Sequence, residues 1–95
     1  MHASIWKFTG ETEDLLRCYE GMLADIPSEN MRLHLCLPQP DGILIVDTCP
    51  SKEVLDGFIK SEAFQGLLAK HGLPTPERFD DYPVHAAFVN GERVV

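Results

Sequence analysis

The sequence lacks any apolar run long enough to cross a membrane. A spanning helix needs about 20 consecutive apolar residues, and every apolar stretch in this chain is far shorter. The opening residues MHASIW are also too short and too polar for a signal peptide. We therefore expect no membrane contact.

Paired cysteines are missing as well. The chain has 3 cysteines, Cys18, Cys36 and Cys49, and no two of them form a CxxC pair. An odd number of isolated thiols is typical of a reducing compartment rather than of a secreted disulfide framework. We therefore expect a cytoplasmic protein with reduced cysteines.

Positive charge is scarce. The chain carries 8 Lys and Arg against 15 Asp and Glu, a formal net charge of -7. Nucleic-acid-binding proteins need clustered Lys and Arg to contact phosphates. This balance argues against a nucleic-acid partner and predicts an acidic surface.

The length of 95 residues indicates one domain, spanning residues 1–95, and no internal repeat divides it. A domain this small buries only about 60% of the surface that its unfolded chain exposes. Further burial through oligomerisation would therefore stabilise it.

Hydrophobic periodicity predicts the order of the elements. Alternation indicates strands, and apolar residues at helical spacing indicate helices. Thr12 and Ser51 are suitable N-caps, and Ser61 resembles a second cap, which predicts a bend in the second helical region. The expected elements are a strand at 2–8, a helix at 12–26, strands at 31–37 and 43–48, a helical region at 51–71 and a strand at 82–89.

The resulting β-α-β-β-α-β order is that of the ferredoxin-like, or split βαβ, arrangement. The segment PQPDG at 38–42 contains several turn signals and joins the two middle strands as a hairpin. We therefore predict an α+β fold with a four-stranded antiparallel sheet and two helices on one face. If the other face is apolar, a second copy of the chain is its simplest cover.

Two stretches carry a resemblance to a known family, namely ILIVDTCPSKEVLDGFIKSEAFQGLL at 43–68 and GLPTPERFDDYPVHAAFV at 72–89. Together with the element order, they resemble the dimeric α/β-barrel superfamily. Its members include small cofactor-independent monooxygenases of antibiotic biosynthesis, haem-degrading enzymes and polyketide cyclases. The resemblance implies a homodimer in which two ferredoxin-like sheets face each other, with no cofactor.

The chain departs from the monooxygenase pattern at the end of the third strand. Many such members carry Trp-Glu-Ser there, where this chain has Cys49-Pro50-Ser51. They also often carry a polar residue earlier on that strand, at the position of Ile45 here. The one tryptophan of this chain, Trp6, lies on a different strand.

The second strand suggests a site. In MRLHLCL, at 31–37, Arg32, His34 and Cys36 alternate with apolar residues and share one face. Asp47 interrupts the β-branched run of the third strand, and His85 lies on the last expected strand. If these residues converge, His34 or His85 is a general base, Asp47 orients it and Arg32 holds a carboxylate or enolate oxygen.

Aromatic residues indicate the kind of ligand. A cavity between the sheet and the helices would be lined by Trp6, Tyr82 and Phe58, which suits a small hydrophobic or aromatic molecule. No histidine or cysteine spacing matches a closed metal site. Relatives use a histidine of the second helical region as a haem ligand, but His71 precedes Gly72 and fits a helix-end position better.

Three functions remain open. The chain could be a cofactor-independent monooxygenase, cyclase or isomerase that uses histidine-assisted proton transfer on a small hydrophobic molecule. It could instead be a non-catalytic dimeric module that binds a small ligand or haem. A third alternative is an assembly protein with a fully packed interior, whose histidines lie at subunit contacts.

Overall fold

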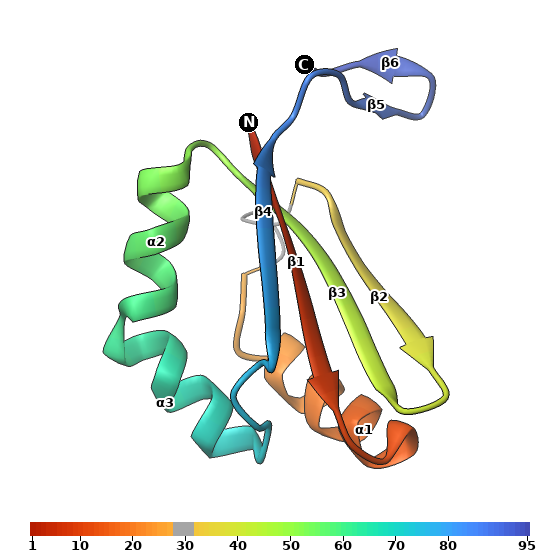
Figure 1. Cartoon of the computed structure of the whole chain (residues 1–95), viewed down its shortest axis with the longest axis vertical. Helices are drawn as coiled ribbons and strands as arrows, with labels where there is room; N and C mark the ends of the chain where they lie inside the picture. The colour runs from red at the N-terminus through yellow and green to blue at the C-terminus, as the bar shows by residue number, and fades with distance from the viewer. Residues whose placement is uncertain (28–31) are drawn as a thin grey trace.

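The computed structural model describes residues 1–27 and 32–95, and only the backbone of residues 78 and 79. Met31, the expected first residue of the second strand, therefore lies outside the described residues. Figure 1 shows the elements, which are β1 (His2–Thr9), α1 (Thr12–Leu23), β2 (His34–Gln39), β3 (Gly42–Cys49), α2 (Lys52–Lys60), α3 (Glu62–His71), β4 (Arg78–Pro83), β5 (Phe88–Val89) and β6 (Glu92–Arg93).

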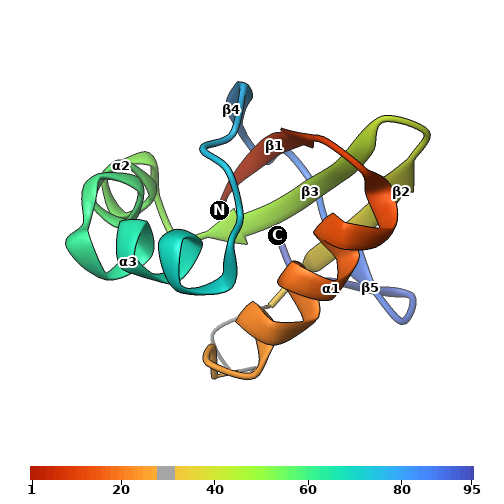
Figure 2. The same cartoon turned by 90° about the horizontal axis from the view of Figure 1, so that it is seen from below.

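Four strands form an antiparallel sheet in the order β2-β3-β1-β4. The helices lie together on one side of this sheet, as Figure 2 shows. Strands β5 and β6 pair with each other as a separate hairpin beyond the end of the sheet. The predicted α+β, ferredoxin-like arrangement is confirmed.

The core lies between the sheet and the helices. Alternate residues of β1 and β3, among them Phe8 and Ile43, point toward the helices and are buried. Burial of each such side chain stabilises the fold by roughly 1.5–3 kcal/mol. The buried hydrophobic residues are Trp6, Phe8, Leu15, Tyr19, Met22, Ile43, Ile45, Leu55, Phe64, Leu68 and Leu73.

Ser61 divides the second helical region into two helices where the sequence predicted one bent helix. Its hydroxyl donates to the carbonyl of Phe58, at 2.6 Å, and so closes α2. The same oxygen accepts from the amide of Phe64, at 3.2 Å, and begins α3. Each helix end thereby gains a partner for a backbone group that the helix itself leaves unpaired.

The other helix ends are capped by nearby residues as predicted, except that the N-cap of α1 is not Thr12. Ser51 caps α2 as predicted, and Gly72 ends α3 with φ 75°, a left-handed conformation that suits glycine. The cap of α1 is Glu11, whose carboxylate accepts from two amides of the first turn. Thr12 instead donates its hydroxyl proton to the carbonyl of Gln39, at 2.5 Å.

Strand β2 begins and ends later than the sequence predicted. The turn between β2 and β3 contains only Pro40 and Asp41, so the strand extends to Gln39. Pro38 lies within it, which is tolerated because β2 is an edge strand. Arg32 therefore precedes the strand instead of belonging to its polar face.

The last sheet strand is also displaced from its expected place. Residues 78–83 pair with β1, although the sequence predicted a loop up to Asp81 and a strand at 82–89. Pro83 has no amide proton to continue the ladder, and the strand ends there. His85 therefore lies in the exposed segment between β4 and β5, off the sheet.

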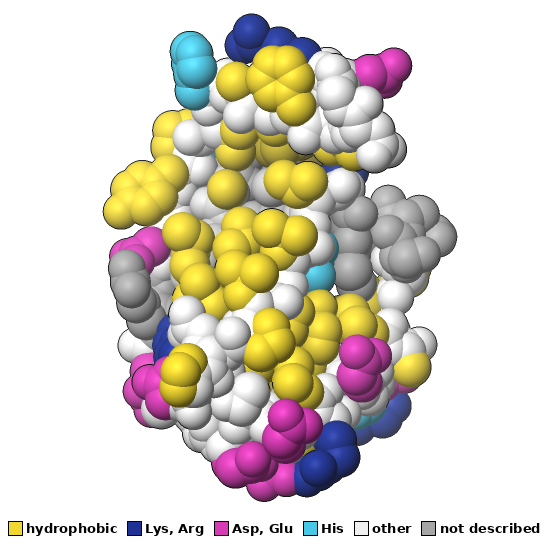
Figure 3. Space-filling view, turned by 90° about the vertical axis from the view of Figure 1, so that its right-hand side faces the viewer, with side chains coloured by type: hydrophobic (Ala, Val, Ile, Leu, Met, Phe, Trp, Pro, Cys, Tyr) yellow, Lys and Arg dark blue, Asp and Glu magenta, His cyan; other side chains and the backbone are white. Residues whose placement is uncertain are grey.

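The sheet face opposite the helices is apolar. Leu35 is 48% exposed, Leu37 41% and Tyr82 62%, and Leu44 and Val46 are partly exposed beside them. We call these residues, with Ile5, the open face. Apolar side chains gather over the middle of this face in Figure 3. Strand β3 thus carries apolar side chains on both faces, and those that face the helices, Ile43 and Ile45, are the more deeply buried.

Within residues 1–27 and 32–95, none of the helices has the length and apolar character required to cross a membrane.

Candidate functional site

A row of polar residues crosses the sheet on the side that faces the helices. Asp47 on β3 is paired directly with His34 on β2 and with Ser4 on β1, and Ser4 is paired with Asp81 on β4. Directly paired residues point to the same face. These four residues, the polar row, interrupt an otherwise apolar layer.

His34 is held between a carboxylate and a phenol. Its Nδ1 lies 3.2 Å from Oδ1 of Asp47, and its Nε2 lies 2.6 Å from the hydroxyl oxygen of Tyr19 on α1. The rings of Tyr19 and His34 are nearly parallel, with 7° between their planes. The structure thus brings together two of the predicted site residues, His34 and Asp47, and adds Tyr19.

These contacts determine the tautomer of the imidazole. An ionised carboxylate can only accept, so Nδ1 of neutral His34 carries the proton and donates it to Asp47. Nε2 then carries a lone pair and accepts from the Tyr19 hydroxyl. The basic nitrogen of His34 therefore points toward α1.

Tyr19 is held as a neutral phenol. Burial in the core raises its pKa to about 12, with smaller contributions from Cys36, Glu20 and Asp47. Burial likewise raises the pKa of the Cys36 thiol. A phenol that remains protonated at neutral pH can donate a hydrogen bond to a developing negative charge.

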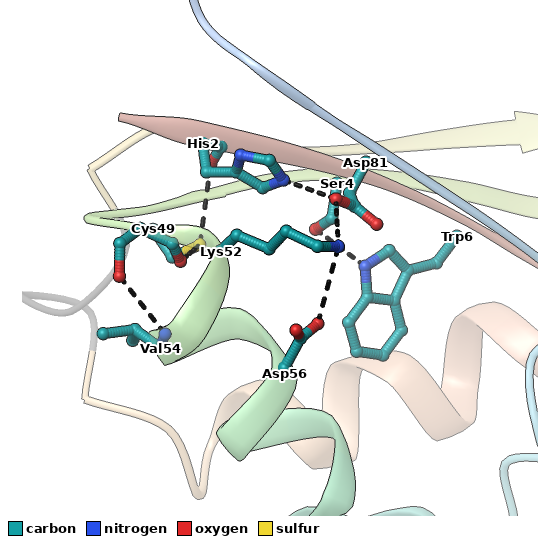
Figure 4. Close-up of polar contacts among 9 residues, drawn as sticks. His2, Ser4, Trp6, Cys49, Lys52, Val54, Asp56 and Asp81 are labelled. Atoms are coloured by element: carbon teal, nitrogen blue, oxygen red, sulfur yellow. Dashed lines mark hydrogen bonds and ion pairs between the residues drawn. The ribbon is translucent and has the colours of Figure 1, made fainter.

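The other end of the polar row holds a second histidine–carboxylate pair. Nε2 of His2 lies 2.5 Å from Oδ1 of Asp81, and Nζ of Lys52 lies 3.1 Å from the same oxygen. Figure 4 shows Lys52 reaching from the start of α2 to lie between Asp81 and Asp56. Hydrogen bonds from His2 and Lys52 hold the pKa of Asp81 below its usual value.

Sequence reasoning missed both Tyr19 and this second pair. Tyr19 has the helical spacing of a core residue, so nothing marked its hydroxyl as a partner of His34. His2 and Ser4 do alternate with apolar residues on β1, which is the same signal that singled out His34. That signal could have identified them.

The aromatic residues predicted to line one cavity lie on two different sides of the sheet. Trp6 is buried, with its ring edge-on to Phe64 at 4.9 Å, and its Nε1 donates to Ser4 at 2.8 Å. Phe58 is 42% exposed on α2 and also packs on Phe64. Tyr82 lies on the open face, on the far side of the sheet.

Two charged candidates also lie away from His34. Arg32 is exposed ahead of β2, and His85 is exposed beyond β4. Within the described part of the chain, neither makes a hydrogen bond or an ion pair with His34 or Asp47. The predicted roles of His85 as a general base and of Arg32 as the holder of a substrate oxygen therefore stay predictions, and the geometry does not favour them.

Cys49 is a poor nucleophile despite its position before α2. Its thiol donates to the carbonyls of Ser51, at 3.2 Å, and His2, at 3.6 Å. Burial is the largest influence and raises the pKa of Cys49. The neutral thiol is therefore the form present at physiological pH.

No metal centre can be assembled from the residues that the structure describes, since no three His, Cys, Asp or Glu side chains cluster suitably. His71, the one histidine in the second helical region, is engaged elsewhere. Its Nε2 lies 2.6 Å from Oδ2 of Asp25, which also binds Lys70. This contact ties the end of α3 to the residues after α1.

Comparisons with known proteins give a likeness of structure. No family model matches the sequence, and no curated protein matches it. A crystal structure from Chloroflexus aurantiacus J-10-fl, described as a "putative Antibiotic biosynthesis monooxygenase", has a TM-score of 0.61 at 15% identity, covering 94% of this chain and 98% of that chain. Another crystal structure, from Deinococcus radiodurans, is described in the same words. It has a TM-score of 0.62 at 14% identity, and the match covers 94% of this chain and 97% of that chain. The chain therefore shares the fold of these two proteins over nearly its whole length.

Proposed function

We propose that the protein is a small enzyme that removes a proton from a hydrophobic, aromatic small molecule. The observation that carries this proposal is the Asp47–His34–Tyr19 chain of hydrogen bonds. Asp47 orients His34, as a carboxylate orients the base in many enzymes. His34 then presents Nε2 beside a phenol that can stabilise the resulting anion.

The geometry suits proton abstraction next to a carbonyl group. His34 Nε2 would take the proton, and the Tyr19 hydroxyl would donate to the enolate oxygen. Asp47 stabilises the imidazolium that forms, because its carboxylate already accepts from Nδ1. A ligand would replace the hydrogen bond between Tyr19 and His34, with its acidic C–H at Nε2 and its carbonyl oxygen at the Tyr19 hydroxyl.

The structural neighbours favour oxidation as the step that follows. An electron-rich enolate of an aromatic ketone can react directly with O2, so such a monooxygenase reaction needs no bound cofactor. Cyclisation or isomerisation would begin with the same proton removal. Fold likeness alone does not select among oxidation, cyclisation and isomerisation. We therefore propose the proton removal that all three share, and oxidation as the next step by analogy with the structural neighbours.

The same proposal includes a homodimer and a cytoplasmic location. The open face exposes contiguous apolar side chains, which favours burial against a second copy. Cys18, Cys36 and Cys49 are all free thiols, as expected in a reducing compartment.

The test uses 1,8-dihydroxyanthrone, an enolisable aromatic ketone, with oxygen uptake as the readout. Oxidation of its methylene carbon to a carbonyl consumes one O2 and releases one water. We expect His34→Gln to slow uptake by about 100-fold or more, the usual contribution of a general base. His71→Gln, which replaces a histidine that binds Asp25 and is not part of the polar row, should retain the parental rate.

Equal rates for the parent and His34→Gln would contradict the proposal. Binding of the anthrone without oxygen uptake or chemical change would favour the alternative, a non-catalytic module for a small ligand. Haem titration of the same sample, followed by its absorbance, tests whether that ligand is haem.

A further inference from the structure

An apolar hollow lies between the C-terminal hairpin and the adjoining end of the sheet. It has a volume of about 300 Å³ and is lined by Met1, Arg32, Leu33, Ala87, Val89 and Val94. Small-ligand sites begin at about this volume. None of these residues belongs to the polar row or to the open face, so the hollow is a separate feature.

Hydrogen bonds hold the walls of the hollow in place. The amide of Val84 donates to the carbonyl of Met1, at 2.9 Å, and the Thr48 hydroxyl donates to the carbonyl of Leu33, at 3.2 Å. The hairpin is closed by the amide of Val94, which donates to the carbonyl of Ala87, at 2.8 Å. Three separate parts of the chain are thus fixed around one space.

The hairpin itself is well defined by its turn. Asn90 and Gly91 have φ of 51° and 80°, the left-handed pair that a two-residue hairpin turn requires. This turn places Ala87, Val89 and Val94 on the wall of the hollow. Figure 1 shows the hairpin standing beyond the sheet, near both chain ends.

Arg32 gives the hollow a positive charge. Several other cations, including Lys7, Lys52 and Lys70, are engaged with aspartates. Among the described side chains, none forms an ion pair with Arg32, which is exposed at the edge of an apolar lining. In a chain of net charge -7, an unpaired guanidinium at this position favours an anionic ligand group.

We propose that this hollow binds a small carboxylate with an apolar tail. The guanidinium of Arg32 binds the carboxylate, for which its planar fork of donors is suited. The tail lies against Leu33, Ala87 and Val89. This site is independent of the proposed enzymatic reaction, because it uses no residue of the Asp47–His34–Tyr19 chain.

Octanoate is the probe, and octan-1-ol is its uncharged counterpart. Each is titrated into the uniformly ¹⁵N-labelled protein while backbone amide resonances are recorded. We expect octanoate to shift the amides of residues 32–33 and 87–94. Octan-1-ol should bind about tenfold more weakly, because it lacks the charge-assisted hydrogen bonds to Arg32.

Two variants distinguish recognition of the carboxylate by Arg32 from nonspecific attraction of an anion to any exposed cation. Arg32→Gln should weaken octanoate binding by about tenfold and leave octan-1-ol unchanged. Lys60→Gln, which removes an exposed cation from the end of α2, is the matched control and should bind octanoate like the parent. The substituted side chains are exposed, so both variants should fold.

Three results would overturn the proposal. One is the absence of any shift at residues 32–33 and 87–94 up to millimolar octanoate, the weak end of specific affinities. A second is an equal affinity of the parent and Arg32→Gln for octanoate. The third is concentration-dependent broadening of these amides with no response to octanoate, which would assign the hollow to a contact between copies of the chain.

Discussion

The hydroxyl of Tyr19 on α1 lies 2.6 Å from Nε2 of His34 on β2, so the helix layer and the sheet meet through a hydrogen bond in the apolar core. Tyr19 is 5% exposed, and the His34 side chain is 15% exposed. A buried phenol or imidazole without a partner would destabilise the fold. The contact therefore links stability to the proposed chemistry.

Tyr19→Phe should lower the free energy of unfolding by about 1–2 kcal/mol. The substitution removes the hydrogen bond and leaves Nε2 of His34 without that partner, while the ring still fills the core. Urea unfolding measures the change. Tyr82→Phe, which removes an exposed phenol, is the control and should change the free energy of unfolding by less than about 0.5 kcal/mol. Equal effects of the two substitutions would contradict this account of Tyr19.

Tyr19 should ionise only at high pH. In Tyr82→Phe, Tyr19 is the one remaining tyrosine, and the ultraviolet absorbance of its phenolate should show a midpoint near its raised pKa of about 12. The unfolded chain binds fewer protons between the unfolded value of 10.0 and this pKa, so stability should fall as pH rises through that range. A midpoint near 10.0 in the folded protein would show that the phenol is not buried.

Leu35→Asp should separate the proposed homodimer. Burial of a leucine stabilises by roughly 1.5–3 kcal/mol, and the change affects both copies, so dimer affinity should fall by about 100-fold or more. Native mass spectrometry and sedimentation velocity measure the mass of the assembly, and so distinguish monomer from dimer in the parent and in each variant. Val54→Asp, at a residue 52% exposed on α2, is the matched control and should leave the dimer intact. A monomeric parent protein would contradict the dimer.

Gly42→Ala should destabilise the fold by about 3 kcal/mol or more. Gly42 has φ 152°, and a Cβ there would lie 2.0 Å from the carbonyl oxygen of Phe8. Gly57→Ala, where nothing lies within 4 Å, should instead stabilise α2 by about 0.5–1 kcal/mol. Thermal unfolding of both variants tests the contrast, and a Gly42→Ala protein as stable as the parent would refute the close approach of β1 and β3.

Several features of the fold could be read from local sequence. The Pro40-Asp41 turn, the Ser51 and Ser61 caps and the Gly72 stop depend on the chemistry of a few neighbouring residues. Local prediction was weaker at strand ends. It placed the last strand at 82–89 because that stretch is the more apolar, whereas pairing with β1 selects 78–83.

The candidate site also could be predicted only in part from local sequence. Alternation placed His34 on a polar face and marked Asp47 as an interruption, and the structure pairs them directly across β2 and β3. Nothing local connected Tyr19 to His34, because a helix phenol and a strand imidazole meet only when the layers pack. His85 was expected beside them only because its strand was misplaced.

The sequence by itself determined the order of the main helices and strands, and the apolar side of each helix. Those properties follow from side-chain periodicity and from capping residues, which act within a few positions along the chain. Tertiary structure alone decided the strand register, the full polar row and the partners of His2, His34 and His71. These depend on which distant segments pack together, and a shift of one residue in a strand would turn every side chain to the opposite face.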